Sequence, residues 1–233
     1  MKKFLKQTKN AVTVSTSNVK AKVTGHKAEE DPDFMDKNTK LNEIEERLQK
    51  LLEAVTTVNS IFKENQKVFA KFNSVLASTM TDEEPARADT TPIATACTNA
   101  YVTCVPKYAL APLNEAISTV KNLKDIREKR KHNLVLLQND EKNLSEAQSK
   151  SKDTAQLEAE TQARKAKYEE FHNQFIAGVD ELYDNRVKLY KKVIAATTFY
   201  YSEVSKVINV ELEKSLDKYN VTVDSSEYQP VDQ

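Results

Sequence analysis

The sequence predicts an all-α protein of three long, kinked helices that form an elongated antiparallel coiled coil. Apolar residues recur every three or four positions from Leu157 to Leu216, and a similar series runs from Leu41 to Leu76. The composition agrees, with two glycines, no tryptophan, 39% hydrophobic and 30% charged residues. A helix of sixty residues is roughly 90 Å long. A compact monomer does not hold such a rod, so other long helices must cover it.

Residues 1–28 are expected to be a basic amphipathic segment that binds membranes. They contain lysines but no acidic residue, and apolar residues from Met1 to Val23 follow helical spacing. We expect the segment to be disordered in water and to become helical at an anionic lipid surface. A basic disordered tail without lipid contact is the alternative. The residues predicted to touch the membrane are Lys2, Lys3, Phe4, Leu5, Lys6 and Lys9.

The first helix is predicted over residues 37–79. A linker over residues 29–38 precedes it, with Asp36 or Asn38 as the capping residue. Its core seam has heptad spacing, and Asn65 is the one polar member, suited to setting register. The seam includes Leu41, Leu48, Leu51, Val55, Phe62 and Phe69. Residues 79–92 lose the periodicity and are predicted to form an acidic loop.

The second helix is predicted over residues 93–149, with Pro106 and Pro112 expected to kink its first half. Its apolar stripe thins between Leu123 and Leu134. Basic side chains crowd the helix there, namely Arg127, Lys129, Arg130 and Lys131. A turn near residue 150 ends the helix, with Lys150 and Lys152 at its tip.

The third helix is predicted over residues 155–218 and forms an antiparallel hairpin with the second. Its seam includes Leu182, Leu189, Val193 and Tyr200. Gly178 inside this helix marks a close helix crossing, a bend or a merely tolerated glycine. Residues 220–233 are polar and predicted to be disordered.

Helices of such unequal length cannot bury all their seams within one chain. A two-fold dimer is the simplest solution. Its middle is a six-helix bundle, from which the hairpins project as arms.

The chain resembles the BAR domains of the amphiphysin and endophilin type that carry an N-terminal amphipathic helix. The resemblance covers almost the whole chain and rests on the order of its segments: basic leader, linker, three helices and a basic hairpin tip. Its most specific stretch is SKSKDTAQLEAETQARKAKYEEFHNQF, followed by VDELYDNRVKLYKKVIAATTFYYSEVSKV. The chain is similar to BAR-only members, which lack an SH3 domain and find partners through heterodimerisation. Residues 29–219 would be the BAR domain.

The resemblance implies a crescent-shaped dimer, of two identical or two different BAR chains, that senses or generates membrane curvature. Its basic concave face and tips would bind anionic phospholipid membranes, with the leader inserted in one leaflet. The matching positions are Arg127, Lys129, Arg130, Lys131, Lys150 and Lys152, with Arg164, Lys165 and Lys167 on the opposing helix. The tip has fewer consecutive lysines than strongly binding members have, and Asp153, Glu158 and Glu160 lie nearby, which implies modest affinity. The family also implies endocytosis or trafficking near actin, hence endocytic or actin-associated partners.

Other classes of function find little support in the sequence. Two isolated glycines cannot form a phosphate loop, and the three histidines are scattered, so neither an enzyme, a metal site nor a cofactor is expected. The formal net charge is zero, and basic residues alternate with acids without an aromatic platform, which disfavours nucleic-acid binding. Without a secretory signal or a spanning stretch, a cytoplasmic protein is expected, with Cys97 and Cys104 reduced. The resemblance implies a peripheral location on the plasma membrane, endocytic sites or the cell cortex. The main alternative is a coiled-coil scaffold or tether that binds proteins rather than lipid.

Overall fold

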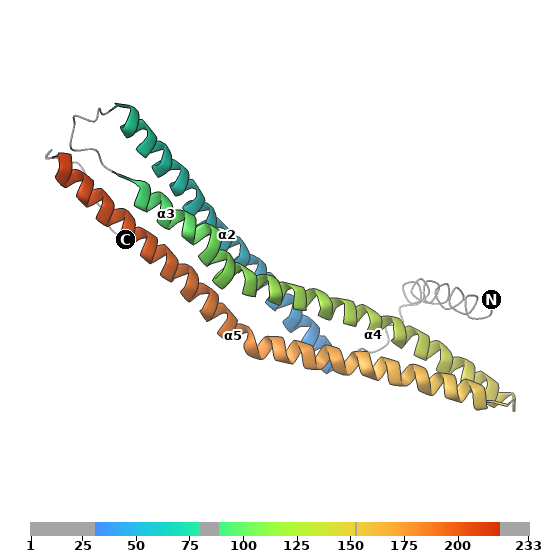
Figure 1. Cartoon of the computed structure of the whole chain (residues 1–233). Coiled ribbons are helices and arrows are strands. Elements are labelled where there is room, and N and C mark those ends of the chain that lie inside the picture. Colours follow the sequence, from blue (N-terminus) through green and yellow to red (C-terminus); the bar gives the residue numbers. More distant parts are fainter. Residues whose placement is uncertain (1–30, 80–88, 152, 220–233) are drawn as a thin grey trace. The chain divides into compact units, whose positions relative to one another are not determined.

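The computed structural model describes residues 31–79, 89–151 and 153–219, and all of its regular elements in these ranges are helical. The first helix is α2 (Pro32–Thr79) and the last is α5 (Ala155–Tyr219). Between them the chain is helical over Thr91–Ser149, as α3 (Thr91–Asn99), two π-helical segments and α4 (Ala111–Ser149) (Figure 1). The predicted all-α class and three long helices are therefore confirmed. The predictions for residues 1–28, most of the acidic loop and residues 220–233 lie outside the described residues.

The α2 helix begins five residues before the predicted start, because Asp31 is its capping residue. The Asp31 carboxylate accepts a hydrogen bond from the Asp33 amide at 3.0 Å, and its carbonyl accepts one from the Met35 amide. Pro32 occupies the first helical position, where the missing amide hydrogen costs nothing. The prediction of a linker up to residue 38, capped by Asp36 or Asn38, was therefore wrong.

Two π-helical segments accommodate the prolines of the second long helix. They span Ala100–Cys104 and Pro106–Leu110, so each ends two residues before a proline, Pro106 or Pro112. In an α-helix a proline ring clashes with the carbonyl four residues earlier. A wider π turn moves that carbonyl aside, and the helix continues without a break.

The chain divides into two compact units, and each long helix contributes to both. Unit 1 lies within Met1–Leu48 and Glu115–Val187, and unit 2 within Gln49–Asn114 and Lys188–Gln233. In each unit three helical stretches surround an apolar core. The buried side chains of unit 1 include Phe34, Leu41, Ile44, Leu48, Val120, Leu123, Leu137, Phe175 and Val179. Those of unit 2 include Val55, Phe62, Ile93, Cys97, Val105, Leu113, Val193 and Val204.

The predicted seam residues divide into buried and partly exposed groups. The buried ones are Leu41, Leu48, Val55, Phe62 and Val193. The partly exposed ones are Leu51, Phe69, Leu182, Leu189 and Tyr200. Phe72, which continues the same three-to-four spacing, is exposed. Within the described ranges, these helices thus bury only part of the apolar surface that their heptads create.

Gly178 lies at a close approach of α4 and α5 in unit 1. A Cβ atom at this position would lie 2.5 Å from Cδ2 of the buried Leu123 side chain. That distance is far inside van der Waals contact. This contact supports the close helix crossing among the three explanations for this glycine.

The crossing predicts a background-dependent effect of alanine at residue 178. In the wild type, Gly178→Ala should lower the free energy of unfolding by about 1 kcal/mol, because overpacking outweighs the gain in helix propensity. In a Leu123→Ala background the clash is absent, so the same change should raise that free energy by about 1 kcal/mol. Urea unfolding of the four proteins measures both steps. Equal effects in the two backgrounds would contradict the crossing.

Candidate functional site

The three arginines predicted to face the membrane are engaged inside unit 1. The Arg127 guanidinium donates to Asn38 at 2.8 Å and lies 3.4 Å from the Glu128 carboxylate. Arg164 on α5 pairs with Asp140 on α4 at 3.4 Å, and both side chains are mostly buried. Arg130 is 1% exposed. Their side chains join helices of unit 1 to one another.

Arg130 is the centre of a buried polar and aromatic cluster. Its guanidinium lies 3.5 Å from the ring centroid of Phe34 and donates to Tyr168 Oη and to His172 Nδ1, both at 3.1 Å. The opposite nitrogen of His172, Nε2, lies 3.5 Å from the Asp31 carboxylate. The cluster therefore joins the first turn of α2 to α4 and α5. The prediction that Arg130 binds lipid was wrong, because its side chain is inaccessible to a headgroup.

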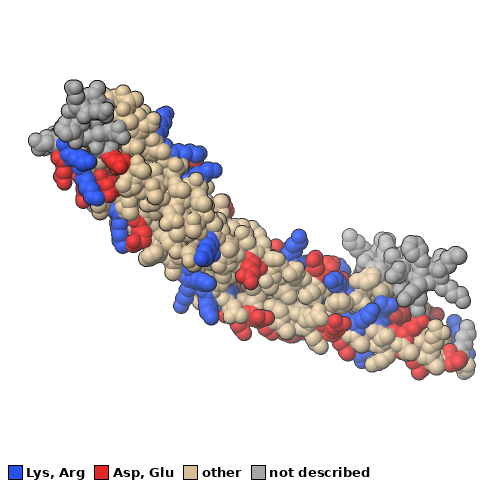
Figure 2. All heavy atoms as spheres, in the orientation of Figure 1, with Lys and Arg blue, Asp and Glu red and all other residues tan. Residues whose placement is uncertain are grey.

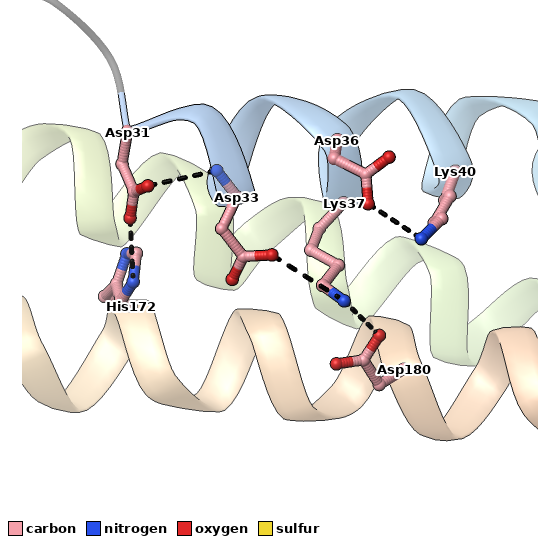
Figure 3. Close-up of polar contacts among 7 residues, drawn as sticks. All are labelled: Asp31, Asp33, Asp36, Lys37, Lys40, His172 and Asp180. Atoms are coloured by element: carbon pink, nitrogen blue, oxygen red, sulfur yellow. Dashed lines mark hydrogen bonds and ion pairs between the residues drawn. The ribbon is translucent and has the colours of Figure 1, made fainter.

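The first turns of α2 hold a row of ion pairs (Figure 3). Lys37 lies between Asp33 at 3.8 Å and Asp180 of α5 at 2.5 Å, and Lys40 pairs with Asp36 at 2.7 Å. The hydrogen bond with Asp180 raises the pKa of Lys37 above its ordinary value. The hydrogen bond with Asp36 does the same for the pKa of Lys40. Lys37 joins α2 to α5 through Asp180, whereas the pair of Lys40 with Asp36 lies within α2.

The lysines predicted to contact membrane are exposed where the structure describes them. They are Lys129, Lys131, Lys150, Lys165 and Lys167. Lys165 lies 4.0 Å from Glu169, and Lys129 lies 6.0 Å from the Phe171 ring centroid. Within the described ranges, Lys129, Lys131, Lys150 and Lys167 have no carboxylate within ion-pair distance. Their ammonium groups are available to an anionic surface, although red acidic atoms lie among the blue ones (Figure 2).

The remaining predicted membrane residues are not described by the structure. They are Lys2, Lys3, Phe4, Leu5, Lys6, Lys9 and Lys152, all of which lie outside the described ranges. The described neighbours of Lys152 form a tight turn, in which Ser151 has a φ of 49°. Asp153 and Thr154 then begin α5, through hydrogen bonds to the Ala155 amide and the Glu158 carboxylate.

Unit 2 has an exposed apolar face on α2 and α5, which we name the α2/α5 stripe. On α2 it contains Ile61, Val68, Phe72 and Val75, each at least 40% exposed. On α5 it contains Ile194, Tyr201, Leu212 and Leu216, each at least 38% exposed. The rings of Phe62 and Tyr201 are 6.0 Å apart, which joins the two helices. Sequence reasoning missed most of this stripe, although the seven-residue spacing of Ile61, Val68 and Val75 signals it.

Within the described ranges, no helix has both the length and the apolar character needed to cross a bilayer. No protein-family model matches the sequence, and no curated protein matches it.

Proposed function

We propose that this protein is a peripheral membrane protein that binds anionic bilayers and senses or generates curvature. The supporting observation is that the arginines and the lysines predicted to bind the membrane have different environments. The arginines hold unit 1 together, whereas Lys129, Lys131, Lys150 and Lys167 are exposed without carboxylate partners within the described ranges. The order of helices and the basic leader agree with the BAR resemblance.

The binding free energy in this proposal comes from many weak contacts. Each lysine near an anionic leaflet contributes about 1 kcal/mol, and the contribution decays within a Debye length. A dimer doubles the number of contacts that engage together. A rigid, curved array satisfies most of them only on a bilayer of matching curvature, so such membranes are bound preferentially.

Dimerisation is the second part of the proposal, and the α2/α5 stripe supports it. Two copies related by a two-fold axis would bury the stripe of each against the other. The resulting six-helix bundle would form the middle of a crescent-shaped dimer. A related BAR chain with a similar stripe fits equally, giving a heterodimer.

In the cell the proposed protein is cytoplasmic and lies on the plasma membrane, endocytic sites or the cell cortex, near endocytic and actin-associated proteins. A coiled-coil scaffold or tether that binds proteins is the second candidate function. The mixture of acidic and basic residues on the arm favours it, because this mixture weakens attraction to lipid.

Vesicle co-sedimentation tests the proposal. Lys131→Glu/Lys167→Glu should weaken binding to anionic vesicles by about 30-fold or more, because each lysine supplies about 1 kcal/mol. The matched control, Lys63→Glu/Lys71→Glu, makes the same charge change on exposed residues of α2 and should change binding much less. Wild-type binding should also fall with added salt. If the wild-type protein does not bind anionic vesicles of any diameter, the coiled-coil scaffold becomes the favoured function.

A further inference from the structure

Two segments of unit 2 contain positive charge and no negative charge. Residues 91–114 contain Lys107 as their single charged residue, and residues 188–202 contain Lys188, Lys191 and Lys192. Neither segment has an aspartate or a glutamate, although the whole chain has as many acidic as basic residues. These segments are therefore a local departure from the balanced charge of the protein.

The structure places the two segments side by side through aromatic contacts. The rings of Tyr108 and Tyr200 stack with centroids 5.9 Å apart, and Phe199 meets Tyr200 edge to face at 5.2 Å. The Lys107 ammonium lies 5.0 Å from the Tyr108 ring centroid. Burial, together with the neighbouring Cys104 and Tyr108, raises the pKa of the Tyr200 hydroxyl. Tyr200 is thus the partly buried ring against which Tyr108 and Phe199 both pack.

The outer rings of this cluster are open to solvent. Phe199 is 56% exposed and Tyr108 is 40% exposed. Lys192 precedes Phe199 by seven residues, which places both on one face of α5. The face over α3, the π-helical segments and the adjoining part of α5 is mostly uncharged in Figure 2. We name the exposed set Lys107, Tyr108, Lys188, Lys192 and Phe199 the aromatic-lysine face.

The charge of this face argues against a second copy as its occupant. A two-fold interface brings each patch against itself, so the lysines of one copy would face those of the other. The α2/α5 stripe has no such conflict and suits self-association better. An anionic partner surface complements the lysines, and the headgroup layer of a bilayer also accepts exposed Phe and Tyr rings.

We propose that the aromatic-lysine face docks on an anionic lipid surface, with Phe199 and Tyr108 entering the headgroup layer and the lysines contacting lipid phosphates. The inference rests on the proposed function, because it assumes that the protein meets a membrane. It adds a contact in unit 2 that anchors through apolar groups. The lysines of unit 1 supply charge alone.

The absence of tryptophan from the chain allows a direct test with the full-length protein. Phe199→Trp introduces a single tryptophan of similar character at the centre of the face. With vesicles of phosphatidylserine and phosphatidylcholine, its emission should shift to shorter wavelength and be quenched by lipids brominated near the headgroup. Ala70→Trp, at an exposed position on α2, is the matched control and should show neither change. Phe199→Ser should weaken vesicle partitioning about tenfold.

The emission of Phe199→Trp and the mass of Phe199→Ser distinguish the possible occupants of the aromatic-lysine face. Unchanged Phe199→Trp emission on vesicles that nevertheless bind the protein would overturn the inference and leave the proposed function standing. Binding of no variant, wild type included, would overturn both. A dimer that dissociates with Phe199→Ser in lipid-free solution would assign the face to a second copy and overturn the inference. Blue-shifted, quenched emission on anionic but not on neutral vesicles would support it.

Discussion

Arg130→Ala is expected to lower the free energy of unfolding by about 3 kcal/mol. The change removes a buried cation and leaves Tyr168 Oη and His172 Nδ1 without their donor. It also empties the space against the Phe34 ring, where the guanidinium lies 3.5 Å from the centroid. Urea unfolding at one fixed protein concentration measures the loss, since self-association would otherwise shift the apparent stability.

Two further variants separate the causes of this loss. Lys131→Ala alters the adjacent exposed residue and should change stability by less than about 0.5 kcal/mol. Arg130→Met keeps much of the side-chain volume but has no donor, so its loss should lie between those of the other two variants. If Arg130→Ala were as mild as Lys131→Ala, Arg130 could not be the centre of a buried cluster.

Val68→Glu is expected to convert the proposed dimer to a monomer, weakening self-association at least about 100-fold. Val68 is 60% exposed in the chain and lies in the α2/α5 stripe. In a two-fold dimer each interface would receive two new carboxylates, and burying an unpaired charge costs several kcal/mol. Sedimentation velocity over a concentration series measures the change in mass.

The control for this prediction is Ala70→Glu, which adds the same charge at an exposed α2 position outside the stripe. It should leave the proposed dimer intact. Circular dichroism should show equal helicity for both variants, because neither side chain is buried within the chain. A monomeric wild type at every concentration, or equal masses for the two variants, would remove the α2/α5 stripe as a self-association surface.

Much of the fold could be predicted from the sequence because long apolar heptads have few alternative structures. Leu41, Leu48, Val55 and Phe62 repeat every seven residues, and all are buried. The ends of helices depend on single contacts instead. The start of α2 at Pro32 depends on one Asp31 side chain, and composition favours Asp36 and Asn38 equally as capping residues.

The candidate site was harder to predict, because the environment of a charged residue depends on residues far along the chain. Arg130 stands in a basic run, which indicates a solvated surface. Its position nevertheless continues the buried series of Leu123 and Leu137 at seven-residue spacing, so it fills the apparent gap in the stripe. Phe34 and Tyr168 supply its aromatic contacts from other helices. The sequence around Arg130 does not predict these contacts.

The π-helical segments change how the second long helix responds to insertions and deletions. Its buried residues Ile93, Cys97 and Ala100 follow α-helical steps, but the next buried residue, Val105, comes five positions later. The segment Ala100–Cys104 therefore holds one residue more than an ordinary turn needs. Losing that residue would restore α-helical phase to the core of unit 2, provided that Pro106 were also replaced. The extra residue is needed only while Pro106 is present. A deletion in Ala100–Cys104 should therefore be tolerated only together with replacement of Pro106.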